Sequence, residues 1–259
     1  MTGSLLAEMA SGIAAGAIRV IDLTETLRPD YPTITLPPEF GQASPFVKQQ
    51  ISRYDEAGPG WYWNNFTVSE HTGTHFDAPV HWVTGKDVAN GSVDTIDPAH
   101  FIAPVCVIDC SREIAADPDF LLTPAVLEAW ENEHGRIAPG CWLFLRSDWR
   151  KIAAPGNYTK LDEDGAHSPG PDAAAVHWMI ERDVIGFGTE CVGTDAGQAF
   201  RFDPQYPCHH YMHGAGKYGL QCMTNLDLLP ATGAMIIAAP LKIEDGSGSP
   251  LRVLALVPA

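Results

Sequence analysis

The densest group of side chains that could do chemistry lies between residues 71 and 81. Three of the chain's ten histidines and one aspartate fall there, namely His71, His75, Asp77 and His81. Two imidazoles and one carboxylate are a common ligand set for Zn²⁺, Mn²⁺ or Fe²⁺ at sites that keep positions open for water and substrate. The spacing therefore predicts a metal site rather than a histidine-rich surface turn.

The local backbone decides whether these side chains can reach one ion. Their even offsets place all four on one face of a strand, whereas a helix would turn Asp77 away from His71 and His75. A straight strand would separate His71 from Asp77 by about 20 Å. The chain must therefore curl, and Gly73 is where we expect it to do so, because glycine accepts conformations that other residues avoid.

The elements that must position this group follow from runs of apolar and β-branched residues bounded by turn residues. Such runs predict strands over residues 20–23, 105–109, 142–145, 184–187, 235–238 and 252–257. A helix is predicted from Thr123, an N-cap followed by proline, to Gly135, and another over 173–181. Helices that alternate with strands indicate an α/β domain.

Two turn-rich stretches, 28–59 and 193–219, are longer than ordinary connections and are expected to be functional loops. The second ends in a G-x-G-x-x-G pattern over 214–219, but a polar, histidine-rich run precedes it where a dinucleotide-binding fingerprint needs a strand. Its glycines are more typical of backbone that passes close to a pocket. His210 and His213 of the same stretch could line the site or support it.

Composition and charge limit the classes of function. The chain has 259 residues, of which 45% are hydrophobic and 19% charged, as is typical of a globular protein. We expect one domain over residues 1–259. The formal net charge of −16 repels nucleic-acid phosphates and anionic lipid, so we expect no nucleic-acid or membrane partner.

The cysteines and the first residues indicate the compartment. The six cysteines are spread along a chain large enough to need no disulfide framework. The N-terminal stretch has no basic start and carries Glu8 in its middle, so it is typical of a short amphipathic helix and not of a secretory signal. A cytoplasmic protein is therefore predicted.

The segment from His71 to His81 reads HTGTHFDAPVH. It resembles the HxGTHxDxPxH signature of the cyclase-like metal-dependent hydrolase family, which includes bacterial kynurenine formamidase and isatin hydrolase. Further landmarks that resemble the family lie at residues 21–24, 141–145, 188–195 and 225–227, so the resemblance covers most of the chain. It implies a swivelling β/β/α domain, with a mixed sheet and flanking helices, that assembles as a homodimer or higher homo-oligomer.

The resemblance also implies roles for individual residues. The positions that match His71, His75 and Asp77 bind metal, and the position that matches His81 handles protons. A later histidine of the family matches His209. Twelve residues on, formamidase-like members have a glutamate that completes a two-zinc site, and Gln221 stands there in this chain.

Gln221 changes the expected metal content, because a neutral glutamine binds metal weakly and compensates no charge. We therefore predict one divalent cation. This substitution and the Trp61–Asn65 segment, WYWNN, resemble the isatin-hydrolysing members. That subgroup suggests Mn²⁺, while the residues themselves leave Zn²⁺ as an alternative.

The expected reaction is hydrolysis of a small planar aromatic amide. A metal ion can lower the pKa of bound water and polarise a carbonyl. His81 is expected to act first as general base and then as acid toward the leaving nitrogen. His209 would hydrogen-bond a substrate oxygen, and Gln221 would donate to a carbonyl or hold a water molecule. Trp63 and Trp82 are expected to wall a slot for a flat ring.

The favoured substrate is isatin, whose cyclic amide opens to isatinate. The nearest alternative is N-formylkynurenine, or another small amide, ester or lactone hydrolysed by the same residues. Two histidines and a carboxylate also describe the facial triad of Fe(II) oxygenases, although those triads usually draw their second histidine from far along the chain. A binding protein that has kept the ion but lost catalysis is a third possibility.

Overall fold

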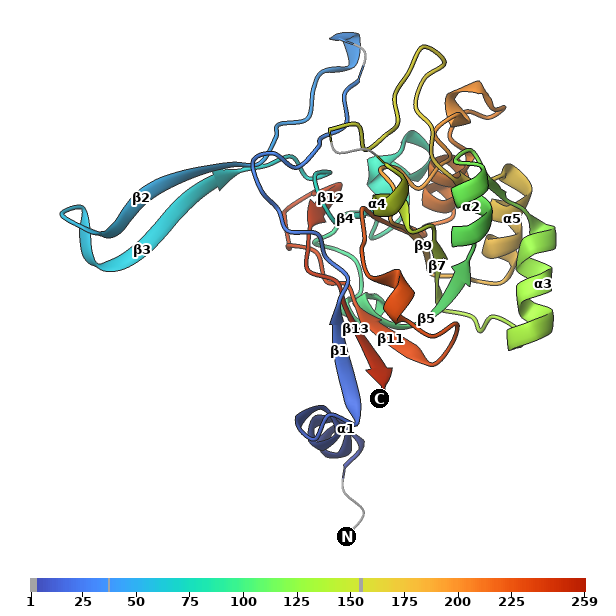
Figure 1. Ribbon diagram of the computed structural model, residues 1–259, viewed down its shortest axis with the longest axis horizontal. Coiled ribbons are helices and arrows are strands. Elements are labelled where there is room, and N and C mark those ends of the chain that lie inside the picture. Colours follow the sequence, from blue (N-terminus) through green and yellow to red (C-terminus); the bar gives the residue numbers. More distant parts are fainter. Residues whose placement is uncertain (1–3, 37, 154–155) are drawn as a thin grey trace.

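A nine-stranded mixed sheet forms the centre of the structure, a computed structural model that describes residues 4–36, 38–153 and 156–259 (Figure 1). Its strand order is β1-β13-β11-β5-β7-β9-β10-β4-β12. The strands are β1 (Ile18–Asp22), β4 (His75–Asp77), β5 (Ile102–Asp109), β7 (Trp142–Arg146), β9 (Gly186–Thr189), β10 (Tyr218–Gln221), β11 (Ala234–Ile237), β12 (Gly248–Pro250) and β13 (Leu254–Pro258). Strands β5, β7, β9 and β10 run parallel, and the flanking pairs are antiparallel.

The helices α2 (Ser111–Ala116), α3 (Pro124–His134) and α5 (Ala173–Glu181) lie together on the right of Figure 1. Helix α3 begins after Thr123 with a proline and ends at Gly135, which has a φ of 90°, as its sequence predicts. Two shorter or peripheral helices are α4 (Trp149–Ile152) and α1 (Leu5–Ala14). The predicted α/β class, with a mixed sheet and flanking helices, is confirmed.

Two hydrophobic cores lie on opposite faces of the central strands. Along β7, Trp142 and Phe144 contribute to one core, and Leu143 and Leu145 contribute to the other. Successive side chains of a strand point to opposite faces, so a strand buried on both sides reads as one continuous apolar run. The sequence therefore predicted β7 clearly. The helices cover one face of these strands, and the curled outer strands cover the other.

A long hairpin projects from this body on the left of Figure 1. It pairs β2 (Val47–Asp55) with β3 (Gly58–Thr67) and is called the arm below. The loop expected over 28–59 is therefore wrong for residues 47–59, which lie in the arm. Most side chains of the arm are exposed. The strands consequently lack the apolar alternation that a core imposes, so no strand was predicted there.

Two short strands, β6 (Leu121–Leu122) and β8 (Gly170–Pro171), form a separate parallel pair. All six cysteines are buried and free. Among the residues that the structure describes, no helix has the length and apolar character needed to cross a membrane.

Candidate metal centre

The chain curls between His71 and strand β4, as the sequence requires for a shared ion. Gly73 adopts a φ of +70°, in the left-handed region that favours glycine. As a result, His71 Nδ1 lies 2.8 Å from Asp77 Oδ1, although six residues separate the two in sequence. The turn at Gly73 therefore brings His71 into contact with Asp77.

Asp77 is fixed by the sheet on both sides. It pairs with Gly219 of β10 and with Gly248 of β12, and its side chain is fully buried. A Cβ atom on Gly219 would lie only 2.8 Å from Asp77 Oδ2, so this glycine leaves room for the carboxylate. Gln221 Nε2 donates a hydrogen bond to the same oxygen.

Hydrogen bonds determine which nitrogen of His71 carries its proton. Ser247 Oγ donates to Glu70 Oε2 over 2.7 Å and lies 2.9 Å from His71 Nε2. Because the serine hydrogen points to Glu70, His71 Nε2 must donate to Ser247 Oγ. When this imidazole is neutral, Nδ1 therefore presents a lone pair to Asp77.

His75 has the opposite tautomer and the same target. Its Nδ1 lies 2.8 Å from the carbonyl oxygen of Gly73, which can only accept, so Nδ1 carries the hydrogen. The lone pair of Nε2 faces Asp77 Oδ1 at 3.3 Å. Two nitrogen lone pairs thus converge on one carboxylate oxygen.

This arrangement fits a divalent cation. Burial raises the pKa of Asp77, but His75 and His71, when a proton lies on the nitrogen that faces the carboxylate, bring this pKa well below its usual range and keep the carboxylate ionised. Ligand atoms about 2.1 Å from a cation lie about 3 Å from each other, and His71 Nδ1 and His75 Nε2 lie 2.8 Å and 3.3 Å from Asp77 Oδ1. The ligand atoms of His71, Asp77 and His81 all lie within 4.8 Å of one another, and this group does not include His75. A divalent cation would take the place of the protons between the two nitrogens and the carboxylate.

His81 lies directly against this group. Its ring stacks on His71 with centroids 3.8 Å apart. One nitrogen of His81 lies within 4.8 Å of ligand atoms of His71 and Asp77, so it could reach the cation or a water molecule beside it. Burial, together with the neighbouring histidines and against the opposing charge of Asp77, lowers the pKa of His81 to about 3, so this imidazole is neutral near pH 7.

His209 and His213 approach Asp77 from the other side. Both belong to a π-helical turn (His209–His213), and their ligand atoms lie within 4.8 Å of each other and of Asp77. His209 Nδ1 lies 2.5 Å from Asp195 Oδ2, and Asp195 also accepts from the backbone N–H groups of Cys208 and His209. Burial lowers the pKa of His209, but Asp195 more than offsets this and raises it.

The sequence left the role of His213 open and missed Asp195. The isolated Asp195 is separated from His209 by thirteen residues, so no spacing rule joins the two. A signal for His213 was its i, i+4 offset from His209. That offset indicated a shared face only if the segment was helical.

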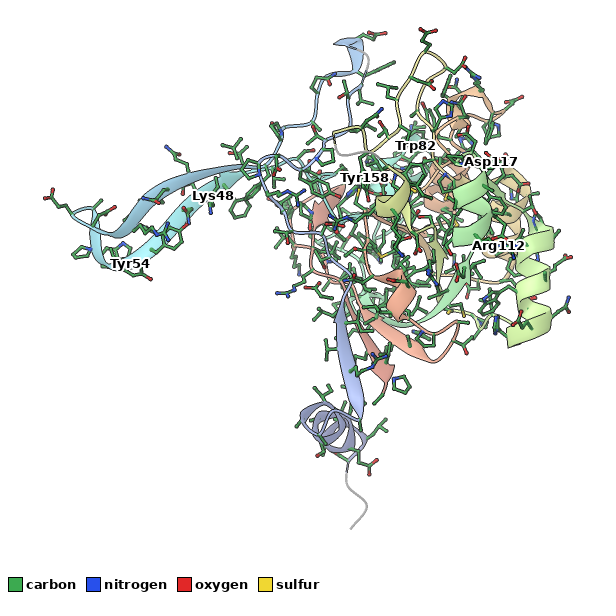
Figure 2. All side chains as sticks on the ribbon, viewed as in Figure 1. Lys48, Tyr54, Trp82, Arg112, Asp117 and Tyr158 are labelled. Atoms are coloured by element: carbon green, nitrogen blue, oxygen red, sulfur yellow. The ribbon has the colours of Figure 1, made fainter. Side chains whose placement is uncertain are left out.

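The two tryptophans predicted to contact substrate, Trp82 and Trp63, lie in different parts of the structure. The ring centroid of Trp82 lies 4.9 Å from that of His209 and 5.7 Å from that of Tyr206, so Trp82 is beside the histidines. Trp63 belongs to the arm and is 54% exposed. Figure 2 shows the arm residues Lys48 and Tyr54 far from Trp82. Within a single chain, the structure therefore does not bring Trp63 and Trp82 together.

Gln221 is engaged on both sides of its amide. Its oxygen accepts from the backbone N–H of Gly193 over 2.7 Å, and its nitrogen donates to Asp77. The side chain is buried and holds the carboxylate. Gln221 thus orients Asp77, and its predicted contact with a substrate carbonyl or a water molecule stays a prediction.

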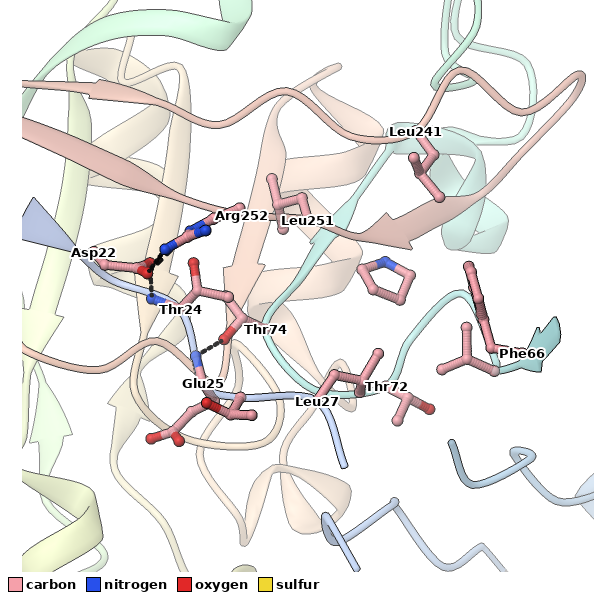
Figure 3. Close-up of a pocket in the computed structure, with 13 residues that line it drawn as sticks. Asp22, Thr24, Glu25, Leu27, Phe66, Thr72, Thr74, Leu241, Leu251 and Arg252 are labelled. Carbon is pink, nitrogen blue, oxygen red and sulfur yellow. Dashed lines mark hydrogen bonds and ion pairs between the residues drawn. The ribbon is translucent and has the colours of Figure 1, made fainter. Parts of the chain in front are cut away.

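A cavity of about 450 Å³ lies behind the signature segment (Figure 3). Thr72 and Thr74 line it, while none of the four histidine and aspartate residues of the signature does. Thr72 and Thr74 therefore face this cavity, on the side of the segment away from the metal site. Thr74 Oγ1 accepts from the backbone N–H of Glu25 and donates to the carbonyl of Cys222, which ties the segment to its neighbours.

Comparison with known proteins gives two groups of relatives. Residues 21–196 match the family described as putative cyclase. The chain is 49% identical over 257 residues to isatin hydrolase of Roseibium aggregatum, which covers 98% of each chain. It is 28% identical over 245 residues to kynurenine formamidase of Erythrobacter litoralis, covering 91% of this chain and 93% of the relative.

Solved structures agree with the sequence matches. Isatin hydrolase A from Labrenzia aggregata bound to benzyl benzoate superimposes with a TM-score of 0.97 at 57% identity, covering 99% of this chain and 100% of the other. An isatin hydrolase bound to the product analogue thioisatinate superimposes with a TM-score of 0.96 at 47% identity over 100% of both chains. A novel cyclase at 18% identity, with a TM-score of 0.72, shares the fold.

The turn at Gly73 can be tested separately from general backbone strain. We expect Gly73→Ala to lose about 1 kcal/mol of unfolding free energy, because alanine disfavours a positive φ. The variant should also bind Mn²⁺ at least about tenfold more weakly, since a second-layer change around metal ligands typically costs about 10–100-fold. Urea denaturation and calorimetric Mn²⁺ titration measure the two effects.

Gly140→Ala is the matched control. Gly140 has a similar φ of +74° and lies before β7, outside the metal cluster. A Cβ at Gly140 would meet nothing within 4 Å, whereas one at Gly73 would also lie 3.1 Å from Leu27 Cδ1. Gly140→Ala should therefore lose unfolding free energy from the backbone strain alone, no more than Gly73→Ala loses, and keep its affinity for Mn²⁺. Equal metal affinities in the two alanine variants would contradict the role given to Gly73.

Proposed function

The chain belongs to the cyclase family, and from that premise we propose that it is a metal-dependent hydrolase that opens the cyclic amide of isatin to give isatinate. The proposal rests above all on one observation, the convergence of His71 Nδ1 and His75 Nε2 on the buried carboxylate of Asp77. The near-full-length similarity to proteins named isatin hydrolase supports this substrate.

One divalent cation would be held by His71 Nδ1, His75 Nε2 and Asp77. We propose Mn²⁺, with Zn²⁺ as the alternative. When bound, such a cation lowers the pKa of a water molecule and polarises the amide carbonyl. A single ion is supported by the charge of the site, because Gln221 next to Asp77 is neutral.

His81 would move the proton. Its neutral imidazole can take a proton from the attacking water and pass it to the departing ring nitrogen as the C–N bond breaks. Its stacking on His71 keeps the ring beside the reacting groups without a hydrogen bond that would occupy its nitrogens.

His209 and Trp82 would bind the substrate. Asp195 holds His209 Nδ1, so the ring can direct only Nε2 toward a substrate oxygen. The raised pKa of His209 favours a proton on Nε2, which makes it a donor to the oxygen that gains negative charge. Trp82 packs against His209 and would cover one face of a flat bicyclic ring.

We also propose that the enzyme is a cytoplasmic homodimer in which the arm of one subunit reaches the site of the other. The exposed aromatic rings of the arm, Trp61, Trp63 and Phe66, are each more than half exposed in the single chain. Covering such rings with a second copy would remove this apolar surface from water. Six free thiols fit a reducing compartment.

The reaction is tested by turnover of isatin with the Mn²⁺-loaded protein. We expect hydrolysis of isatin with N-formylkynurenine as a poor substrate, and His81→Ala should lower kcat by about 10²–10⁴-fold at unchanged metal content. Because burial lowers the pKa of His81 to about 3, protonation of His81 should leave kcat/KM flat as the pH falls through 6.5 and lower it only as the pH approaches 3. Preferential turnover of N-formylkynurenine would favour the formamidase alternative, and loss of metal in His81→Ala would make His81 a ligand instead.

The single-metal proposal is tested with Gln221→Glu. The new carboxylate would face Asp77, and their repulsion is relieved if a second cation binds between them. We expect one equivalent of metal per chain in the natural protein and two in the variant at saturating Mn²⁺, measured by elemental analysis after gel filtration. Gln221→Met removes the amide without adding charge and should keep one equivalent; two equivalents in the unaltered protein would reject the proposal.

The exchanged arm is tested by mixing two impaired variants. Trp63→Ala should raise the KM for isatin several-fold, and His81→Ala should have little activity. In a mixed dimer, the Trp63→Ala subunit keeps His81 and receives Trp63 from its partner, so one complete site forms. After unfolding and refolding together, the mixture should show a low-KM activity that neither parent has; no such activity would mean that Trp63 does not act across subunits.

A further inference from the structure

A buried nitrogen beside the proposed site has no hydrogen-bond partner. His213 is 1% exposed, and among the residues that the structure describes its Nε2 has no donor or acceptor within reach. The ring centroid of His213 lies 5.4 Å from that of His209 and 6.0 Å from that of His81. His213 therefore faces the residues proposed to act on substrate.

The backbone determines what kind of group Nε2 is. His213 Nδ1 lies 3.1 Å from the carbonyl oxygen of Lys217, which can only accept, so Nδ1 carries the hydrogen. The backbone N–H of Lys217 donates to Met212, and its side chain pairs with Asp183, so this carbonyl is held in place. Nε2 is consequently a hydrogen-bond acceptor that lacks a donor.

The other histidine nitrogens of the site are already committed. His71 uses Nε2 on Ser247, and His75 uses Nδ1 on Gly73. Their remaining lone pairs face Asp77 as proposed metal ligands. His209 Nδ1 is held by Asp195, and His81 is assigned to proton transfer. Of the acceptors around Asp77, His213 Nε2 alone has no assigned use.

A secondary amide brings one hydrogen-bond donor, its N–H. We propose that His213 Nε2 accepts a hydrogen bond from the N–H of the scissile amide, and that this contact makes the enzyme selective for secondary amides over N-substituted ones. The inference rests on the proposed amide hydrolysis. A buried acceptor rejects a ligand that cannot donate to it, because that ligand leaves the acceptor desolvated and unpaired.

A second cation is the rival occupant, since His213, His209 and Asp77 could also ligate one. The charge of the site disfavours it. Asp77 is the one carboxylate that the two clusters share, and a first cation held by His71 and His75 would already use its charge. Metal content in a His213 variant separates the two occupants.

Two substitutions divide the functions of the ring. His213→Asn can keep the donor to the Lys217 carbonyl while removing the acceptor, because an asparagine amide overlaps Nδ1. His213→Gln can place an amide oxygen near the position of Nε2 and so restore an acceptor. Comparing the two variants distinguishes loss of the acceptor from general loss of packing.

The experiment measures kcat/KM for isatin and for N-methylisatin, which lacks the N–H. We expect the unaltered enzyme to prefer isatin by about tenfold or more, equivalent to about 1.4 kcal/mol. His213→Asn should lower kcat/KM for isatin about tenfold and change that for N-methylisatin less than threefold. His213→Gln should recover most of the preference, and all forms should hold the same amount of metal.

Several results would overturn the inference. One is an unaltered enzyme that shows no preference between the two substrates. In His213→Asn, an equal fall of kcat/KM for both substrates would also overturn it, and so would a rise of kcat/KM for N-methylisatin alone, which would indicate a steric effect. Loss of a metal equivalent in that variant would indicate a metal ligand instead. Absence of a preference in the unaltered enzyme overturns the inference even if a variant does not fold. Failure of the proposed function is distinguished from these outcomes, because the Mn²⁺-loaded protein would then turn over neither substrate.

Discussion

The site depends on three acceptor atoms that face one another where water is scarce. The lone pairs of His71 Nδ1 and His75 Nε2 both point at Asp77 Oδ1, and hydrogen bonds to Ser247 and Gly73 prevent either ring from changing its tautomer without losing a partner. Without a positive charge between them these atoms repel, and in a buried setting that repulsion is poorly screened. The surrounding structure therefore has to hold these three atoms close together against their mutual repulsion.

The sheet provides that restraint at short range. Asp77 is paired on both sides; Gly219 lets its strand approach the carboxylate closely, and Gly248 leaves room for the ring of His71. Gln221 then fixes the second oxygen of Asp77 with an uncharged donor. This leaves one face of the carboxylate for His71 and His75 and another for His209 and His213. The fold thus divides a single carboxylate between a proposed metal side and a proposed substrate side.

The sequence predicted the elements that bury apolar residues and the part of the site that is contiguous. Strand β7 reads as an apolar run, and the histidines of the signature fall close together. What it could not predict depends on distant partners. The tautomer of His213 follows from a carbonyl at Lys217 at the end of a π-helical turn, and Asp195 meets His209 only after the chain folds back. The arm was missed because strands that pair mainly with each other leave no hydrophobic period.

The burial of every thiol has a practical consequence. Since all six cysteines are enclosed and none is more than 8% exposed, the native surface offers no readily accessible thiol to alkylating dyes. A single cysteine introduced at the exposed tip of the arm, for example at Tyr54, would then be the one readily labelled position. Fluorophores or spin labels could be attached there to the unaltered background, and the separation of two arms could be followed directly in solution.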